Sequence, residues 1–167
     1  MFKKIDTTEL NDNFFSKIGN EWMLVTAGDK DKFNTMTASW GGVGVLWNTD
    51  VAFTFIRDSR NILEFMDNSE YYTLSFFNGK FMKELAFCGT NSGRDVDKIS
   101  ATGLTPVHDE NITYFEQAEL VLVCKKIYKQ KMTSDCFIDK SIIEKSYSKG
   151  DWHEMFVGKI VSVLKKA

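Results

Sequence analysis

The stretch NTMTASWGGVG, from Asn34 to Gly44, joins a strand-like pattern to a cluster of glycines. Short polar side chains alternate with Met36, Ala38 and Trp40, and three glycines follow within the next four residues. Alternation with a period of two predicts a β-strand that has two different faces. The small side chains and the glycines predict that another group can approach the backbone closely here.

The segments on either side of this stretch predict more strands, separated by short helices. The candidate strands are rich in β-branched and aromatic residues, and they cover residues 22–28, 35–40, 50–57, 71–77, 118–132 and 153–164. The candidate helices show helical periodicity or capping residues, and they cover residues 6–19, 59–66, 79–89 and 139–147. Six or seven strands that mostly follow one another favour a mainly β fold, an antiparallel barrel with short helical insertions.

Length and charge limit the possible functions. A chain of 167 residues with 43% hydrophobic residues can bury the core of one domain, so we expect a single domain over residues 1–167. The net charge of −2 and the scattered basic residues argue against nucleic acid or an anionic membrane as a partner. No apolar run approaches the roughly 20 residues of a membrane span. Three widely spaced cysteines without a signal peptide predict a cytoplasmic protein.

Several kinds of catalytic site find little support. The only histidines, His108 and His153, lack the surrounding motifs of a hydrolytic triad. Two histidines and three isolated cysteines do not form a metal-binding pattern, so we expect no metal. The glycines that follow Trp40 lack the third glycine and the helix of a dinucleotide fingerprint.

Two loops have the composition of phosphate-binding turns. FIRDSRN places Arg57, Ser59, Arg60 and Asn61 where a predicted strand turns into a helix. GTNSGRDVDK collects hydroxyl groups, glycine and basic side chains before another helix start, and its candidate residues are Thr90, Ser92, Gly93, Arg94 and Lys98. Each loop alone could be an ordinary capped helix start with solvated basic residues. Two such loops in one small domain favour a phosphate.

The opening strand would suit a flat ligand beside that phosphate. Thr35, Thr37 and Ser39 share one face, and Ala38 lies between them. A planar heteroaromatic ring needs backbone N–H groups at its edge and short side chains around them. An ordinary amphipathic strand has the same pattern, so both interpretations stay open at this point.

The chain resembles the FMN-binding split-barrel family of flavin reductase-like proteins, especially its flavoredoxin-like branch. Five segments carry the resemblance in the same order along nearly the whole chain, namely NTMTASWGGVGVLWNTDVAFTFIRDSRN, YYTLSFF, LAFCGTNSGRDVDKISATGLTP, FEQAELVLVCKKIY and GDWHEMFVGKIV. The resemblance implies a split β-barrel, a homodimer, and FMN held without a covalent bond near the dimer interface.

The resemblance also assigns roles to individual residues. The strand that would line the isoalloxazine ring consists of Asn34, Thr35, Met36, Thr37, Ala38, Ser39 and Trp40. The two phosphate and ribityl loops would comprise Arg57, Ser59, Asn61, Cys88, Gly89, Thr90, Ser92, Gly93, Arg94 and Lys98. His153 matches a histidine near the flavin or substrate in relatives, although Trp152 departs from the common Gly-Asp-His order and leaves open which of the two faces the ring.

Three functions follow from these observations. The first is an FMN-dependent oxidoreductase in which His153 is catalytic and NAD(P)H is a possible electron donor. The second is an electron-transfer flavoprotein reduced by a protein partner, without a nicotinamide site. The third is an interaction module that no longer binds flavin. The segment ASWGG differs from the serine-rich run of reductases that feed monooxygenases, so the sequence supports FMN binding more strongly than nicotinamide use.

Overall fold

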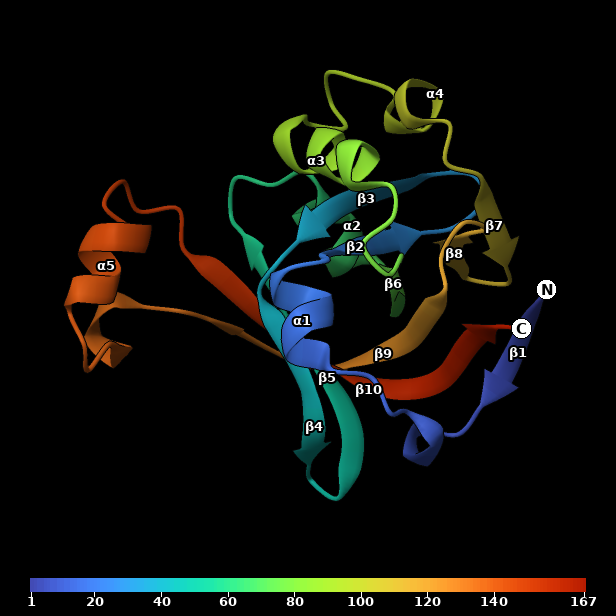
Figure 1. Cartoon of the computed structure of the whole chain (residues 1–167). Coiled ribbons are helices and arrows are strands. Elements are labelled where there is room, and N and C mark those ends of the chain that lie inside the picture. The colour runs from blue at the N-terminus through green and yellow to red at the C-terminus, as the bar shows by residue number, and fades with distance from the viewer.

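The computed structural model describes residues 1–167 and consists mainly of antiparallel strands (Figure 1). The strands are β1 (Phe2–Ile5), β2 (Met23–Gly28), β3 (Phe33–Ala38), β4 (Gly41–Leu46), β5 (Thr49–Arg57), β6 (Tyr71–Phe76), β7 (Pro106–Asp109), β8 (Ile112–Phe115), β9 (Leu120–Lys131) and β10 (His153–Lys166). The helices are α1 (Phe14–Gly19), α2 (Ile62–Asn68), α3 (Met82–Thr90), α4 (Lys98–Thr102) and α5 (Ser141–Ser146), with 3-10 turns η1 (Thr7–Glu9) and η2 (Ser134–Cys136).

Eight strands form one sheet that curls into an open barrel. Seven follow the order β3-β2-β6-β9-β10-β5-β4, and β1 adds to β10. The two ends of this order, β3 and β4, are free edges that do not pair with each other. Only Ser39 and Trp40 separate them in the sequence. The stretch 34–44 therefore crosses the opening of the barrel from one free edge to the other.

Gly41 explains why glycine follows the first edge strand at once. It has a φ of 149°, and a Cβ built on it would lie 2.8 Å from the carbonyl oxygen of Phe53 and 3.2 Å from the Met23 side chain. Gly41 pairs with Thr54 at the start of the β4–β5 ladder. A side chain at this position would push β4 away from β5.

The central strands are buried on both faces. In β9, Leu120, Leu122 and Cys124 belong to the core cluster inside the barrel, whereas Val121 and Val123 belong to a second cluster. This second cluster lies between the sheet, helix α3 and the β7–β8 hairpin. Burial on both faces accounts for the nearly continuous apolar run in this part of the sequence.

Four strands were not expected from the sequence. Three of them, β1, β7 and β8, have only four residues each, and β4 contains three glycines, which are poor strand formers. The remaining strands match the predicted segments to within a few residues. The expectation of a mainly β barrel with short helical insertions is confirmed, and the count of six or seven strands is too low.

The predicted helix over residues 6–19 is wrong in its first half. Asp6 and Glu9 do form a capping box, but it closes only the 3-10 turn η1, because Leu10 is extended. The helix α1 starts after Asn13, which accepts hydrogen bonds from the backbone N–H groups of Phe15 and Ser16.

No helix in the chain combines the length and the apolar character needed to cross a membrane.

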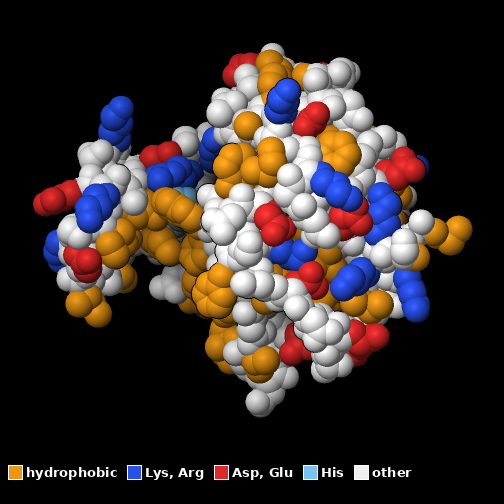
Figure 2. Space-filling model, in the orientation of Figure 1, with side chains coloured by type: hydrophobic (Ala, Val, Ile, Leu, Met, Phe, Trp, Pro, Cys, Tyr) orange, Lys and Arg blue, Asp and Glu red, His pale blue; other side chains and the backbone are white.

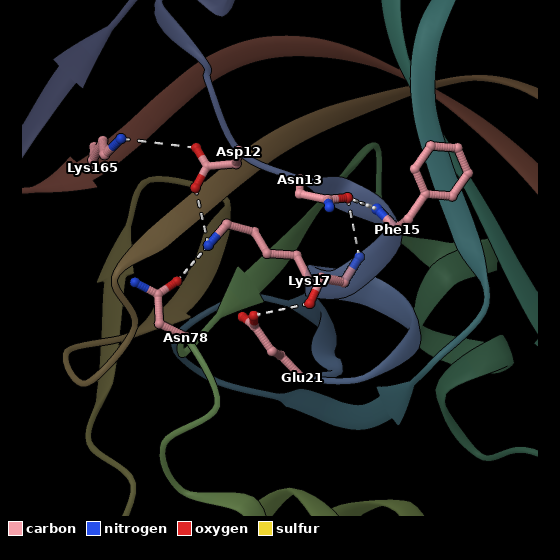
Figure 3. Close-up of polar contacts among 8 residues, drawn as sticks. Asp12, Asn13, Phe15, Lys17, Glu21, Asn78 and Lys165 are labelled. Atoms are coloured by element: carbon pink, nitrogen blue, oxygen red, sulfur yellow. Dashed lines mark hydrogen bonds and ion pairs between the residues drawn. The ribbon is translucent and has the colours of Figure 1, made fainter.

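Helix α1 lies beside β4, and its polar contacts join it to the residue Asp12 before it and to the turn after β6 (Figure 3). Lys17 is almost fully buried, its Nζ lies 3.0 Å from the Asp12 carboxylate, and it donates a hydrogen bond to Asn78. The opposite side of the helix leaves Phe15 94% exposed, which is unusual for so large an apolar side chain. The helix is therefore held rigidly while it presents a phenylalanine to the surface.

Residues 132–152, which we call the arm, project from the barrel between β9 and β10 (Figure 1). Three aromatic side chains of the arm pack together, and the Tyr147 and Trp152 rings are stacked with centroids 4.8 Å apart. Phe137 lies 5.6 Å from Tyr147 and 5.7 Å from Trp152. The arm ends at His153, the first residue of β10. It therefore places its aromatic cluster next to β5, where the guanidinium of Arg57 lies over the Tyr147 ring.

Candidate functional site

A groove lies along the edge strand β3 and has two compartments that share Met36 and Arg60. The aromatic compartment has a volume of about 220 Å³ and is lined by Met36, Thr37, Ala38, Ser39, Trp40, Phe55, Arg57, Arg60 and His153. The polar compartment has a volume of about 230 Å³ and is lined by Asn34, Met36, Ser59, Arg60, Asn61, Ile62, Thr90, Asn91, Ser92, Gly93 and Lys98. Because the compartments share two residues, they can hold one elongated ligand.

The polar compartment contains a buried cation. Lys98 is the first residue of α4 and is only 6% exposed, and its Nζ donates to the carbonyl oxygens of Thr35 at 2.7 Å and Cys88 at 2.9 Å. Burial lowers the pKa of Lys98 to about 8. An ammonium group has three donors, so the third is free for a ligand.

Arg60 adds a second positive charge where the two compartments meet. Its guanidinium donates to the carbonyl oxygen of Gly89 at 2.8 Å, and burial lowers its pKa. Neither compartment is lined by an aspartate or a glutamate. Two partly or fully buried cations without a lining carboxylate create a site that favours an anion.

Gly93 keeps the wall of the polar compartment open. A Cβ on this residue would lie 2.5 Å from Oδ1 of Asn34. Asn34 is itself buried, and its Oδ1 accepts a hydrogen bond from the Thr35 N–H at 2.8 Å. A larger residue at position 93 would displace Asn34 and disturb the start of β3.

The threonines of β3 face different surroundings. Thr35 is buried, and its hydroxyl lies 2.9 Å from that of Thr26 inside the sheet, so its side chain does not reach the groove. Thr37 donates a hydrogen bond to the carbonyl oxygen of Leu85 and ties β3 to helix α3. Along its outer edge β3 has no strand partner, which leaves backbone groups available beside Thr37, Ala38 and Ser39.

The aromatic compartment is built around Arg57. Its guanidinium donates to the carbonyl oxygens of Asp151 at 2.9 Å and Ser146 at 3.1 Å, so it fastens the arm to β5. It also lies over the rings of Trp40 and Tyr147, at 5.9 and 5.1 Å from their centroids. In Figure 2, apolar side chains gather in the hollow between the arm and the barrel.

His153 closes the inner end of the aromatic compartment. It is 6% exposed, and its ring lies 5.3 Å from that of Trp40. Burial and the nearby charge of Arg57 lower the pKa of His153 to about 4. The imidazole is therefore neutral above about pH 5.

Most of the residues singled out in the sequence line the groove. The structure brings together Asn34, Met36, Thr37, Ala38, Ser39, Trp40, Arg57, Ser59, Asn61, Thr90, Ser92, Gly93, Lys98 and His153. Four others do not line it, namely Thr35, Cys88, Gly89 and Arg94. Cys88 and Gly89 contribute only through their carbonyl oxygens, which hold Lys98 and Arg60. Trp152 stacks on Tyr147 in the arm, so His153 is the residue that reaches the groove.

Arg57 and Arg60 divide the role that the sequence suggested for one turn. We expected Arg57 beside the second loop, but it lies in the aromatic compartment because the arm holds its guanidinium. Arg60 instead lines both compartments. Arg60 belongs to the segment FIRDSRN that the sequence indicated as a phosphate-binding turn, but nothing in the sequence distinguishes its role from that of Arg57. Asn91 and Phe55 are further lining residues that the sequence did not single out.

A family model described as flavin reductase like domain matches residues 15–167. The chain belongs to this family. No curated protein matches the sequence significantly. The match covers both compartments of the groove and every strand from β2 onward.

Several solved structures have the same fold. Flavoredoxin from Methanosarcina acetivorans is 20% identical, with a TM-score of 0.67 over 98% of this chain and 76% of that chain. An FMN-binding domain of a flavin reductases-like enzyme from Shewanella baltica OS155 is 12% identical, with a TM-score of 0.71 over 99% and 77%. NADH:FAD oxidoreductase from Streptomyces globisporus C-1027 is 14% identical, with a TM-score of 0.65 over 87% and 75%. These likenesses show that the fold is a split β-barrel.

Proposed function

We propose that the protein binds FMN in the groove and acts as an FMN-dependent oxidoreductase. The observation that carries this proposal is the pair of cations, Lys98 and Arg60, in a compartment without acidic residues, next to a free strand edge with short side chains. FMN combines a phosphate with a flat ring system, and family members from other organisms are described as FMN-binding.

The residues present fit FMN in both compartments. Lys98 and Arg60 would hold the phosphate together with the amide of Asn61 and the hydroxyl of Ser92. The hydroxyls of Ser59 and Thr90 donate to Asp151 and to the carbonyl oxygen of Ala86, so these two residues shape the polar compartment. The edge of β3 at Thr37, Ala38 and Ser39 would lie along the ring system, because its backbone groups are free and its side chains are short. FMN supplies transfer of a hydride or of single electrons when it is bound.

The chain contributes orientation and a positive potential. Arg57 and Arg60 both line the aromatic compartment, and no carboxylate lines it. Fixed cations in a partly enclosed groove favour a ligand that gains negative charge on reduction. His153 is the candidate catalytic residue, since it is the neutral titratable group that borders this compartment.

A second candidate function is electron transfer from a protein partner without a nicotinamide site. The related structures include both flavoredoxins and an NADH:FAD oxidoreductase, so family membership is compatible with either function. The two functions differ in whether NADH or NADPH reduces the bound FMN directly.

Stopped-flow reduction distinguishes these functions. NADH or NADPH should bleach the bound FMN under anaerobic conditions, and His153→Ala should slow this step about tenfold, the effect of losing one hydrogen bond of about 1.4 kcal/mol. Dithionite needs no binding site and should reduce both proteins at similar rates. Bleaching by dithionite alone would exclude the nicotinamide reductase and favour a protein electron donor.

We also propose that the protein is a homodimer, as the family resemblance implies. A cavity of about 410 Å³ between α1 and β4 is lined largely by apolar residues, and it adjoins the groove at Ser39 and Trp40. Large apolar side chains are exposed around it and on the arm, namely Phe15, Trp40, Val45, Trp47 and Ile138. Sedimentation should give about twice the 19.1 kDa of one chain. A single species of one-chain mass at micromolar concentration would contradict the dimer.

We also propose a cytoplasmic location, and the three free cysteines agree with it.

A further inference from the structure

Tyr147 contacts His153 from the arm. The phenol oxygen of Tyr147, the residue that follows α5, lies 2.7 Å from Nδ1 of His153. The two rings are nearly perpendicular, with centroids 5.6 Å apart. Tyr147 is itself buried, and it does not line the groove. It can therefore influence a ligand in the aromatic compartment only through the lining residues that it contacts, His153 and Arg57.

The surroundings of Tyr147 determine where its proton lies. Apart from Nδ1 of His153, the phenol oxygen has one other partner, the sulfur of Met132 at 3.6 Å. A neutral imidazole nitrogen accepts a hydrogen bond far better than a thioether does, so the phenol donates to Nδ1. Burial raises the pKa of Tyr147, and hence the hydroxyl keeps its proton at neutral pH.

A hydrogen bond accepted at Nδ1 leaves the ring proton of neutral His153 on Nε2. Nε2 has no hydrogen-bond partner in the chain, and it is not fully buried. His153 lines the aromatic compartment, so Nε2 is the ring atom that a ligand can reach.

We propose that Tyr147 is a positioning residue that holds His153 as a neutral Nε2–H donor toward a ligand in the aromatic compartment. The ligand chemistry that such a donor recognises is an acceptor atom, such as a carbonyl oxygen on a planar molecule. The Nε2–H tautomer of His153 follows from contacts within the chain. Its role in catalysis rests on the proposed function.

Neighbouring contacts hold the pair rigid. The Tyr147 ring is stacked on Trp152, and the guanidinium of Arg57 lies over the Tyr147 ring at 5.1 Å from its centroid. Arg57 in turn donates to carbonyl oxygens at both ends of the segment 146–151. The Asp151 carboxylate accepts hydrogen bonds from the N–H and the hydroxyl of Ser59, which joins the arm to the turn before α2. The arm is thus fastened at the point where Tyr147 meets His153.

Burial is the main reason that the His153 ring stays neutral, and the charges that face it act in both directions. Arg57 of β5 disfavours the protonated ring, while Asp151 of the arm and Asp58 after β5 oppose this effect only in part. Asp58 is also paired with Lys131 of β9 at 2.6 Å, and Asp151 is occupied by Ser59. The donor should therefore persist unchanged from about pH 5 to pH 8.

Nitrogen NMR of the full chain tests this proposal. The protein has only two histidines, and a His108→Gln variant identifies the signals of His153. Long-range ¹H–¹⁵N spectra should show a single Nε2–H tautomer for His153 between pH 5 and pH 8. In Tyr147→Phe, the Nδ1–H tautomer should become populated because Nδ1 has lost its donor, so the averaged Nδ1 resonance should move to lower frequency and the Nε2 resonance to higher frequency.

Tyr128→Phe is the matched control, since it removes an exposed hydroxyl that bonds only Gln130. This variant should leave the His153 spectrum unchanged. An Nδ1–H tautomer in the unmodified chain, or an unchanged Nδ1 resonance in Tyr147→Phe, would overturn the proposal. The spectra do not depend on FMN, so a failure of the proposed function would appear separately, as a protein that takes up no FMN.

Discussion

Replacing Lys98 by Met should weaken FMN binding about 10- to 100-fold and leave riboflavin binding nearly unchanged. Riboflavin has the same ring system but no phosphate. The Lys98 ammonium lies in the polar compartment, where it has a free donor and no acidic partner. A charge-assisted hydrogen bond contributes about 1.5–3 kcal/mol, which corresponds to this loss of affinity.

Two controls separate the charge of Lys98 from its structural role. Lys98 also donates to the carbonyl oxygens of Thr35 and Cys88, and a damaged groove would weaken both ligands equally. An equal loss would therefore show that Lys98 acts through the fold. Lys83→Met removes an exposed lysine of helix α3 and should change neither affinity.

The pH dependence of binding gives a second readout of the same charge. Since the pKa of Lys98 is about 8, the ammonium is protonated in the free protein below that pH. A bound phosphate raises this pKa, so binding above pH 8 requires the uptake of a proton. FMN affinity should be flat between about pH 7, where the phosphate is a dianion, and pH 8, and fall by up to about tenfold per pH unit above pH 8. Lys98→Met should lose this decline, and riboflavin should not show it.

Replacing Gly158 by Ala should lower the free energy of unfolding by about 3 kcal/mol and the midpoint of thermal unfolding by about 6–12 °C. A Cβ on Gly158 would lie 2.4 Å from the hydroxyl of Tyr72 and 2.8 Å from Cβ of Cys124. Both neighbours are fully buried in the barrel, and the Tyr72 hydroxyl lies 3.2 Å from that of Thr54. Neither can move without disturbing β6, β9 or β5.

Thermal and urea unfolding of a matched pair test this prediction. Gly19→Ala is the control, because a Cβ at that position at the end of α1 would meet no atom within 4 Å. It should change stability by less than about 1 kcal/mol. Equal stability of Gly158→Ala and the unmodified chain would show that the barrel interior is not closely packed at this point.

The strands could be predicted where their pattern is simple, but irregularities within them could not. Alternation along residues 153–164 places Phe156, Gly158, Ile160 and Ser162 on one face. The structure agrees as far as Ile160, which packs against the core cluster, but the pairing register with β9 shifts between Ile160 and Ser162, and Val163 enters the core in place of Ser162. A bulge depends on the partner strand, which the local sequence does not contain.

Much of the candidate site was visible in the sequence because short stretches carry it. The segment from Asn34 to Trp40 and the two loops contain most of the lining residues. The contribution of the arm could not be predicted, since no sequence pattern shows that the chain turns back between Tyr147 and His153 and brings the two rings together. The separate positions of Arg57 and Arg60 likewise depend on carbonyl groups of distant segments.

The most direct test of the account is the identity and affinity of the flavin that the full chain binds. The purified protein, or the protein after addition of FMN, should show the two visible bands of bound flavin, and heating should release FMN. Equilibrium titration should give tighter binding for FMN than for riboflavin, by about the 10- to 100-fold that the phosphate contacts predict. A colourless protein that takes up no added FMN, or one that binds riboflavin as tightly as FMN, would contradict the proposed site.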